Sequence, residues 1–139
     1  MRSAGFTLIE IMVVVVILGI LLSVVVPQVM NNPDKARIQL AKQNIRAIES
    51  ALDLYRLNHF KYPTTDEGLG ALVSPPGGAD LRGYPAGGYM KTKPMDPWNN
   101  EYVYLNPGTQ GAIDIYSLGA DGQPGGDGIN ADIGNWELN

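Results

Sequence analysis

Cysteine is absent from the 139-residue sequence, so no disulfide can close a loop in this chain. Basic residues are scarce as well: 10 Lys and Arg stand against 14 Asp and Glu, which gives a formal net charge of -4. An acidic chain lacks the basic surface that binds a phosphate backbone, so we expect no nucleic acid as a partner. His59 is the only histidine, and a lone histidine without an adjacent acid and nucleophile indicates no catalysis.

The length leaves room for one membrane element and one small domain, which argues against a two-domain enzyme. Glycine (17 residues) and proline (10 residues) are concentrated after Tyr62, so we expect turns and short strands in the second half of the chain. A membrane-tethered hydrolase is a further class to weigh. The sequence has neither a Gly-x-Ser-x-Gly motif nor a cysteine nucleophile to support it.

Residues 6–30 form a long apolar run in which Glu10 is the only charge. At ~1.5 Å per helical residue, such a run can cross the ~30 Å hydrocarbon core of a bilayer. A secretory signal peptide would have several basic residues before a short apolar core and an A-x-A site after it, whereas only Arg2 precedes this run and no such site follows. We therefore predict a transmembrane helix over residues 6–30, with a plain signal anchor as the alternative.

Two residues inside this run weaken a helix. Proline removes one hydrogen bond and clashes with the preceding turn, so we expect a kink or a locally melted segment near Pro27, and Gly19 is a second weak point. Membrane helices commonly tolerate both residue types, which is the alternative to a functional hinge.

We expect Glu10 to have a polar partner, because inserting an ionised carboxylate into a membrane span costs a few kcal/mol and such a group usually faces another polar group. A cut between Gly5 and Phe6 would create an α-amino group at Phe6. Glu10 of a neighbouring subunit could neutralise that cation during packing. On this hypothesis the carboxylate sets the register of assembly.

The segment Gly5-Phe6-Thr7-Leu8-Ile9-Glu10, followed by an apolar helix, resembles the class III signal of type IV pilins and pseudopilins. The resemblance implies that a prepilin peptidase removes a leader over residues 1–5, cleaves between Gly5 and Phe6, and methylates the amine of Phe6. It also implies a bacterial inner-membrane protein with a single pass, in contact with membrane lipid, whose C-terminal domain over residues 31–139 lies in the periplasm.

After a loop-like stretch at residues 31–34, with Asn32 or Asp34 as the cap, we predict an amphipathic helix. Its apolar positions alternate in steps of three and four, as expected for one face of a helix. A face that packs on a globular core is favoured over a coiled-coil seam, because the stripe lasts fewer than three heptads. The stripe consists of Ile38, Ala41, Ile45, Ile48, Leu52 and Tyr55.

The remaining segments predict an α+β fold. Thr64 stands three residues before Glu67, which is the spacing of a capping box and indicates a short helix. Strands are expected at residues 89–90, 101–105 and 112–117, with a turn at 106–108, forming a small antiparallel sheet on the long helix. The expected core of this sheet contains Tyr102, Tyr104, Ile113, Ile115 and Trp98.

Four further segments, at residues 62–65, 94–98, 117–122 and 132–136, resemble the major pseudopilins of type II secretion systems. Lys93 and Asn99 depart from the family pattern around Asp-Pro-Trp. The resemblance implies a type IV pilin-like α+β fold: a long N-terminal helix with a membrane-spanning first half, packed on a small antiparallel sheet with a C-terminal calcium-binding loop.

The loop over residues 118–136 carries the carboxylates Asp121, Asp127 and Asp132 among glycines. It lacks the spacing of an EF-hand, and the residues alone leave open a plain turn-rich loop or a Ca²⁺ site. The family resemblance implies Ca²⁺ bound through Asp121 and Asp132, the backbone oxygens of Leu118 and Gln123, and less clearly Asp127.

The leading hypothesis is therefore a structural subunit, not an enzyme, that polymerises into the periplasmic pseudopilus and drives export of folded proteins. Its implied partners are copies of itself, minor pseudopilins, the inner-membrane secretion platform and the prepilin peptidase. The alternative is a type IV pilin subunit for adhesion or motility. The acidic loop and the absence of a C-terminal cysteine pair count against that alternative.

Overall fold

The computed structural model describes residues 4–78 and 82–138, apart from the side chains of residues 24–32. It has one long helix, α1 (Leu8–His59), and a three-stranded sheet, which confirms the α+β class. The strands are β1 (Val103–Leu105), β2 (Asp114–Ser117) and β3 (Ile133–Gly134), and short 3₁₀ helices lie at Leu69–Leu72, Pro76–Gly78, Gly128–Asn130 and Asn135–Glu137. The chain divides into two compact units, Met1–Ala36 and Arg37–Asn139.

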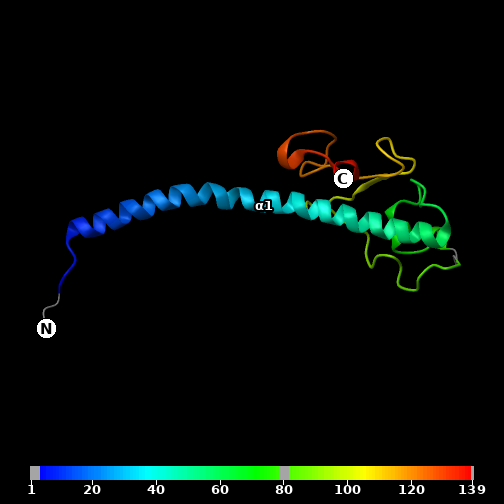
Figure 1. The fold of residues 1–139 in the computed structure, drawn as a ribbon, viewed down its shortest axis with the longest axis horizontal. Coiled ribbons are helices and arrows are strands. Elements are labelled where there is room, and N and C mark those ends of the chain that lie inside the picture. The colour runs from blue at the N-terminus through cyan, green and yellow to red at the C-terminus, as the bar shows by residue number, and fades with distance from the viewer. Residues whose placement is uncertain (1–3, 79–81, 139) are drawn as a thin grey trace. The chain divides into compact units, whose positions relative to one another are not determined.

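Helix α1 continues through the stretch at residues 31–34, so the predicted loop between two helices is wrong (Figure 1). A proline inside a helix costs about 3 kcal/mol, and the uninterrupted helical turns on both sides of Pro33 outweigh that local loss. Helix α1 is also continuous through Pro27, so the expectation of a locally melted segment there is wrong. The side chain of Pro27 lies outside the described residues, and its role as a hinge stays a prediction. At Gly19 an added Cβ would meet nothing within 4 Å.

Among the described residues, no helix is both long and apolar enough to cross a membrane. Residues 24–30 of the predicted span lie outside the described side chains. The large apolar side chains that are described in the first unit are well exposed, from 50% at Ile11 to 85% at Phe6.

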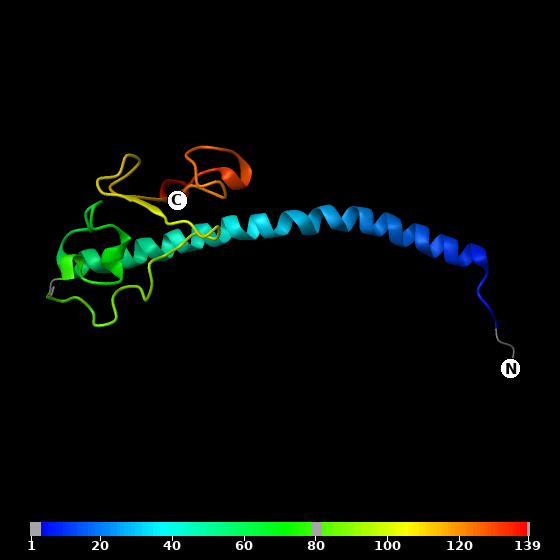
Figure 2. The ribbon, with the colours of Figure 1, turned by 180° about the vertical axis from the view of Figure 1, so that it is seen from behind.

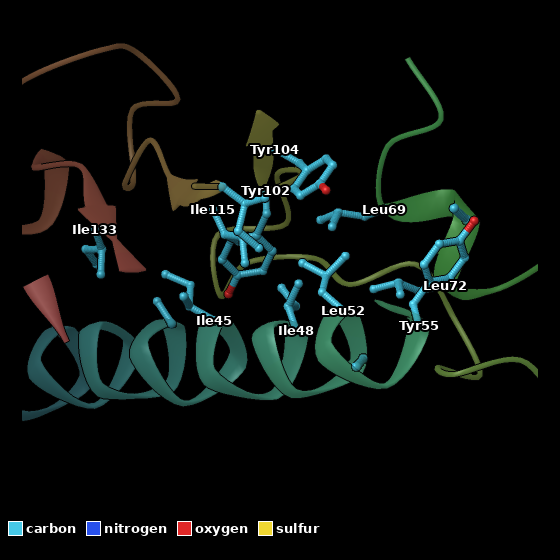
Figure 3. Close-up of a cluster of buried hydrophobic side chains, with 14 residues drawn as sticks. Ile45, Ile48, Leu52, Tyr55, Leu69, Leu72, Tyr102, Tyr104, Ile115 and Ile133 are labelled. Atoms are coloured by element: carbon cyan, nitrogen blue, oxygen red, sulfur yellow. The ribbon is translucent and has the colours of Figure 1, made fainter. Parts of the chain in front are cut away.

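The predicted apolar stripe of α1 forms one side of the hydrophobic core in the second unit. Ala41, Ile45, Ile48 and Leu52 are fully buried and Tyr55 is 1% exposed, while Ile38 packs against the cluster at its edge. Figure 3 shows the side chains of Ile45, Ile48, Leu52 and Tyr55 pointing from α1 toward those of the sheet and of Leu69 and Leu72. The cluster also includes Tyr104, Ile115 and Ile133 from the strands, and Tyr102 and Ile113, which directly precede β1 and β2. Trp98 is partly buried and packs against it.

The sheet is antiparallel throughout, in the order β1-β2-β3, and lies along α1 together with the other segments after the helix (Figure 2). Tyr104 pairs with Ile115, and Ser117 pairs with Ile133. The two predicted strands at 101–105 and 112–117 are confirmed over slightly shorter spans, but the predicted strand at Tyr89–Met90 is wrong. Both backbone amides there donate to the single carbonyl of Leu72, at 2.8 and 3.0 Å, which occupies the donors that a strand would need.

The capping box at Thr64 is confirmed. The Thr64 amide donates to the Glu67 carboxylate at 2.8 Å, and the Glu67 amide donates to Thr64 Oγ1 at 3.2 Å. The helix expected after it is only a turn followed by the 3₁₀ helix Leu69–Leu72. Gly68, with φ +60°, interrupts the helical path between them.

The connection between β1 and β2 is closed by a buried carboxylate in place of a disulfide. Asp114 is 1% exposed, and its oxygens accept hydrogen bonds from the amide and hydroxyl of Thr109 at 2.7 and 2.9 Å. The amides of Gln110 and Gly111 donate to the same group at 3.1 to 3.2 Å. Burial raises the pKa of this carboxyl, but the hydrogen bonds together outweigh burial and leave the pKa below its ordinary value.

We expect Asp114→Asn to lower the free energy of unfolding by about 3 kcal/mol, because the amide brings donors to a site lined with N–H groups. Urea unfolding followed by tryptophan fluorescence measures this, since Trp98 and Trp136 both lie in the second unit. The lowered pKa means that the ionised carboxylate stabilises the fold above its unfolded pKa, near 3.8, and that this contribution is lost as the pH falls through the folded pKa. The difference between the two proteins should therefore shrink in acid. Exposed Asp66→Asn is the control, and equal stability of Asp114→Asn and wild type at pH 7 would refute this role.

The residue that follows helix α1 has a strained backbone. Phe60 has φ +64°, its amide donates to the carbonyl of Arg56 at 2.7 Å, and its ring is 91% exposed. A left-handed backbone costs a bulky L-residue about 1–2 kcal/mol, whereas glycine adopts it freely.

We expect Phe60→Gly to raise the free energy of unfolding by about 1 kcal/mol, once the larger chain entropy of unfolded glycine is subtracted. Phe60→Ala is the matched control, because it removes the ring and keeps the strain. The same urea titration distinguishes them, and an equal change in both variants would show that the backbone conformation is not the cause.

Candidate functional site

The N-terminal candidate site begins just before α1. Residues 4–7 are non-helical, and both Gly5 and Phe6 are exposed, the latter at 85%. The peptide bond between them therefore lies on an accessible segment, and α1 begins at Leu8, two residues after Phe6. An added Cβ at Gly5 meets nothing within 4 Å, so the fold itself does not require glycine there.

Thr7 and Glu10 form a capping box at the start of α1. The Thr7 amide donates to Glu10 Oε2 at 2.9 Å, and the Glu10 amide donates to Thr7 Oγ1 at 3.3 Å. The Thr-x-x-Glu spacing in the sequence is that of a capping box, although only a partner in another subunit was predicted for Glu10. The carboxylate is held beside the positive end of the helix dipole.

The C-terminal candidate site is the loop that follows β2. Its backbone is folded tightly on itself: the Ala120 amide donates to the carbonyl of Ile129 at 2.8 Å. Gly119 has φ +76°, and an added Cβ there would come within 2.8 Å of the Ile129 and Asn130 carbonyl oxygens. Gly126, with φ +96°, approaches the Asn130 carbonyl even more closely, at 2.6 Å from the added Cβ. The glycines are therefore needed for close packing of the main chain.

The three aspartates of this loop have different environments. Asp121 Oδ1 accepts the Gln123 amide at 3.1 Å, and Asp132 Oδ2 accepts the Gly125 amide at 3.1 Å. Asp132 Oδ1 is buried and has no hydrogen-bond partner among the described residues. Asp127 precedes the 3₁₀ helix Gly128–Asn130 and makes no side-chain capping bond.

A buried carboxylate oxygen without a partner fits the oxygen ligands that Ca²⁺ prefers. In the described part of the chain, however, no three Asp, Glu, His or Cys side chains gather into a group that could hold a metal. A cation in this loop would need main-chain carbonyls for most of its ligands. The participation of Leu118 and Gln123 through their backbone oxygens stays a prediction.

The loop is anchored by a buried polar group that sequence reasoning did not assign. Asp96 is 5% exposed and accepts the Ser117 hydroxyl at 2.7 Å, and Ser117 Oγ in turn accepts the Gly119 amide at 3.1 Å. The amides of Trp98 and Asn100 donate to Asp96 Oδ1 at 3.0 and 2.8 Å. These hydrogen bonds hold the backbone in place where the chain enters the loop.

His59 lies among aromatic rings. Its Nε2 is 3.0 Å from the Tyr89 hydroxyl, and its ring centroid is 4.4 Å from that of Tyr55. The Tyr84 ring stacks on it at 6.0 Å. These contacts assign His59 to packing at the end of α1.

Comparisons with known proteins agree with this arrangement. The family described as "Prokaryotic N-terminal methylation motif" matches residues 1–26, and the family "Type II secretion system (T2SS), protein G" matches residues 28–136. The "Type II secretion system core protein G" of Vibrio cholerae is 56% identical over 137 residues, covering 99% of this chain and 94% of that protein. The protein of the same name from Pseudomonas aeruginosa is 57% identical over 137 residues, covering 98% and 96%.

Among solved structures, the major pseudopilin from the type 2 secretion system of enterohaemorrhagic Escherichia coli is similar with a TM-score of 0.67 and 47% identity, covering 78% of this chain and 94% of that one. The long helix, the small antiparallel sheet and the methylation motif together define a pseudopilin. More specifically, the chain belongs to the protein G family of type II secretion systems.

Proposed function

We propose that this protein is the structural subunit that polymerises into the periplasmic pseudopilus of a type II secretion system and so drives export of folded proteins across the outer membrane. The observation that carries this proposal is the match of the protein G family over residues 28–136, on a fold that the major pseudopilin shares. The subunit performs no chemistry in this role. Its partners are copies of itself, minor pseudopilins and the inner-membrane platform.

The N-terminal segment supports processing as a prepilin. The exposed Gly5–Phe6 bond is the proposed cleavage site of a prepilin peptidase, with methylation of the new amine at Phe6. The mature chain is anchored in the inner membrane by residues 6–30, and its C-terminal domain lies in the periplasm. Glu10, which accepts a hydrogen bond from the Thr7 amide, would neutralise the Phe6 amine of a neighbouring subunit during assembly.

We further propose Ca²⁺ as the ligand of the C-terminal loop. The unpartnered, buried oxygen of Asp132 supports this, with Asp121 on the same loop and the backbone oxygens of Leu118 and Gln123 as additional ligands. Asp127 makes no side-chain capping hydrogen bond and is a weaker candidate. A bound divalent cation would neutralise the carboxylates and hold the loop closed without a disulfide.

Removing the gene for this chain from its host and restoring it on a plasmid tests the proposed function. The expected result is that folded exported proteins accumulate in the periplasm without the chain and reach the medium when it is restored. A strain that exports normally but loses surface attachment or motility would instead favour a type IV pilin.

A further inference from the structure

Ser117 lies where the two ends of the C-terminal loop meet. It is the last residue of β2 and pairs with Ile133, the first residue of β3. Leu118 and Asp132 are the next residues on either side of this pair, at the start and the end of the loop. Both are proposed calcium ligands, Leu118 through its backbone oxygen and Asp132 through its carboxylate. The side chain of Ser117 is therefore placed to affect how the loop presents them.

Ser117 belongs to a buried chain of hydrogen bonds. It is 0% exposed, its hydroxyl donates to Asp96 Oδ2 at 2.7 Å, and its Oγ accepts the Gly119 amide at 3.1 Å. A carboxylate can only accept, so the hydroxyl proton lies toward Asp96 and Oγ is left to accept from Gly119. Asp96 thus orients the hydroxyl of Ser117, and Ser117 holds the amide of Gly119.

The Gly119 amide determines the direction of the Leu118 carbonyl. The two groups belong to one peptide unit, which is planar and trans, so its C=O points opposite to its N–H. Because the N–H is held toward Ser117 Oγ, the Leu118 oxygen is turned away from Ser117. Rotation of this oxygen would require breaking the hydrogen bond to Ser117.

Asp96 is itself held in a tight turn. Its Oδ1 accepts the amides of Trp98 and Asn100 at 3.0 and 2.8 Å, and its own amide donates to the Asn100 carbonyl at 2.8 Å. The turn also approaches the loop at a second place, since a Cβ added at Gly122 would lie 3.7 Å from Asn100 Nδ2. Residues 96–100 are therefore a fixed support for the loop.

We propose that Asp96 and Ser117 are positioning residues for Ca²⁺ binding, which act through the Gly119 amide to set the direction of the Leu118 carbonyl. The inference rests on the proposed calcium ligand of the loop and adds two residues that act through a peptide group and not as ligands themselves. A carbonyl whose direction is fixed in advance loses less freedom on binding, which increases affinity. Groups that orient metal ligands in this way typically contribute about 10- to 100-fold to metal affinity.

Isothermal titration of the full-length protein in detergent with calcium chloride tests this role. Ser117→Ala removes the acceptor of the Gly119 amide and should raise the Kd for calcium about tenfold or more. Thr65→Ala is the matched control, because Thr65 Oγ1 likewise donates and accepts, at 3.1 and 2.9 Å from the Asn106 carbonyl oxygen and amide nitrogen. It should lower the free energy of unfolding measured with chelator and leave the calcium Kd unchanged. An unchanged Kd in Ser117→Ala would overturn the proposal, because a purely structural hydroxyl would affect stability alone.

Asp96→Asn is the conservative second variant, which decides the matter if Ser117→Ala fails to fold. The amide keeps the shape of the side chain, but its NH₂ group would donate to Ser117 Oγ and compete with the Gly119 amide. The calcium Kd should rise, by less than in Ser117→Ala. Asp114→Asn, at the other buried carboxylate that holds backbone amides, is the control and should lose stability without a change in calcium Kd. Equal calcium Kd values in Asp96→Asn and wild type would contradict the role of Asp96.

The double variant shows whether the two residues act through the same peptide group. If Asp96 acts only through Ser117, adding Asp96→Asn to Ser117→Ala should leave the calcium Kd at the value of Ser117→Ala alone. Multiplication of the two fold-changes would indicate independent effects and overturn the proposal. A wild-type chain that binds no calcium would instead refute the proposed calcium ligand, and this inference with it.

Discussion

Gly5→Val should leave the chain full-length in the membrane, beginning at Met1, with no methylated Phe6 and no export through the secretion system. The structure explains why this effect must act on processing and not on folding. An added Cβ at Gly5 meets nothing within 4 Å, and residue 5 lies before the first residue of α1. On the proposed processing, the need for glycine would therefore come from the peptidase that cuts after residue 5, which requires close access to the backbone at the cleaved bond.

The N-terminal mass of the purified protein measures this directly, in a host that carries a prepilin peptidase. Ala4→Val is the matched control, because it places the same valine side chain one residue earlier and should be cut normally. A Gly5→Val chain that still begins at methylated Phe6 would refute the proposed cleavage site. An intact Met1 start in the wild-type protein would withdraw the pilin-type pathway altogether.

The part of the fold that sequence periodicity describes was predicted well. The stripe from Ile38 to Tyr55 forms one side of the core, and the capping box at Thr64 has the expected pair of hydrogen bonds. Both depend on spacing within a single segment, which the sequence displays directly.

The errors share a different physical origin. At residues 31–34 a local signal from Pro33 was outweighed by helical turns on both sides. At Tyr89 and Met90 the backbone donors are taken by the carbonyl of Leu72, a contact between distant segments that no local pattern shows. The short strand β3 was missed for the same reason, because Ile133 and Gly134 become a strand only by pairing with β2.

For the candidate sites too, features that depend on spacing within one segment were predicted, and features that depend on contacts between distant segments were not. The motif at Gly5 and Glu10 and the acidic loop were recognised from their composition and spacing. The Thr-x-x-Glu pattern at residues 7–10 also encodes the pairing of Thr7 with Glu10, which was not predicted. The buried Asp96, which anchors the loop through Ser117, depends on a contact across the fold and could not be derived from one segment.

Calcium should raise the melting temperature of the full-length protein, and a chelator should reverse the effect. A ligand present at about 100 times its dissociation constant stabilises the native state by about 2.7 kcal/mol, which corresponds to roughly 10 °C or more for a domain of this size. The loop offers the buried, unpartnered oxygen of Asp132 for this interaction. Magnesium should do much less, because it demands a rigid octahedral shell that a loop of main-chain carbonyls does not provide.

Asp132→Asn distinguishes binding in this loop from a general effect of divalent salt. The substitution keeps the shape of the side chain and removes its charge, so the thermal gain with calcium should be largely lost. Asp66→Asn, an exposed change outside the loop, is the control and should respond to calcium like wild type. Identical melting curves of the wild-type protein with calcium and with chelator would refute the site. An unchanged response in Asp132→Asn would place the cation elsewhere, because the one buried carboxylate oxygen left without a partner in this loop would then have no part in binding it.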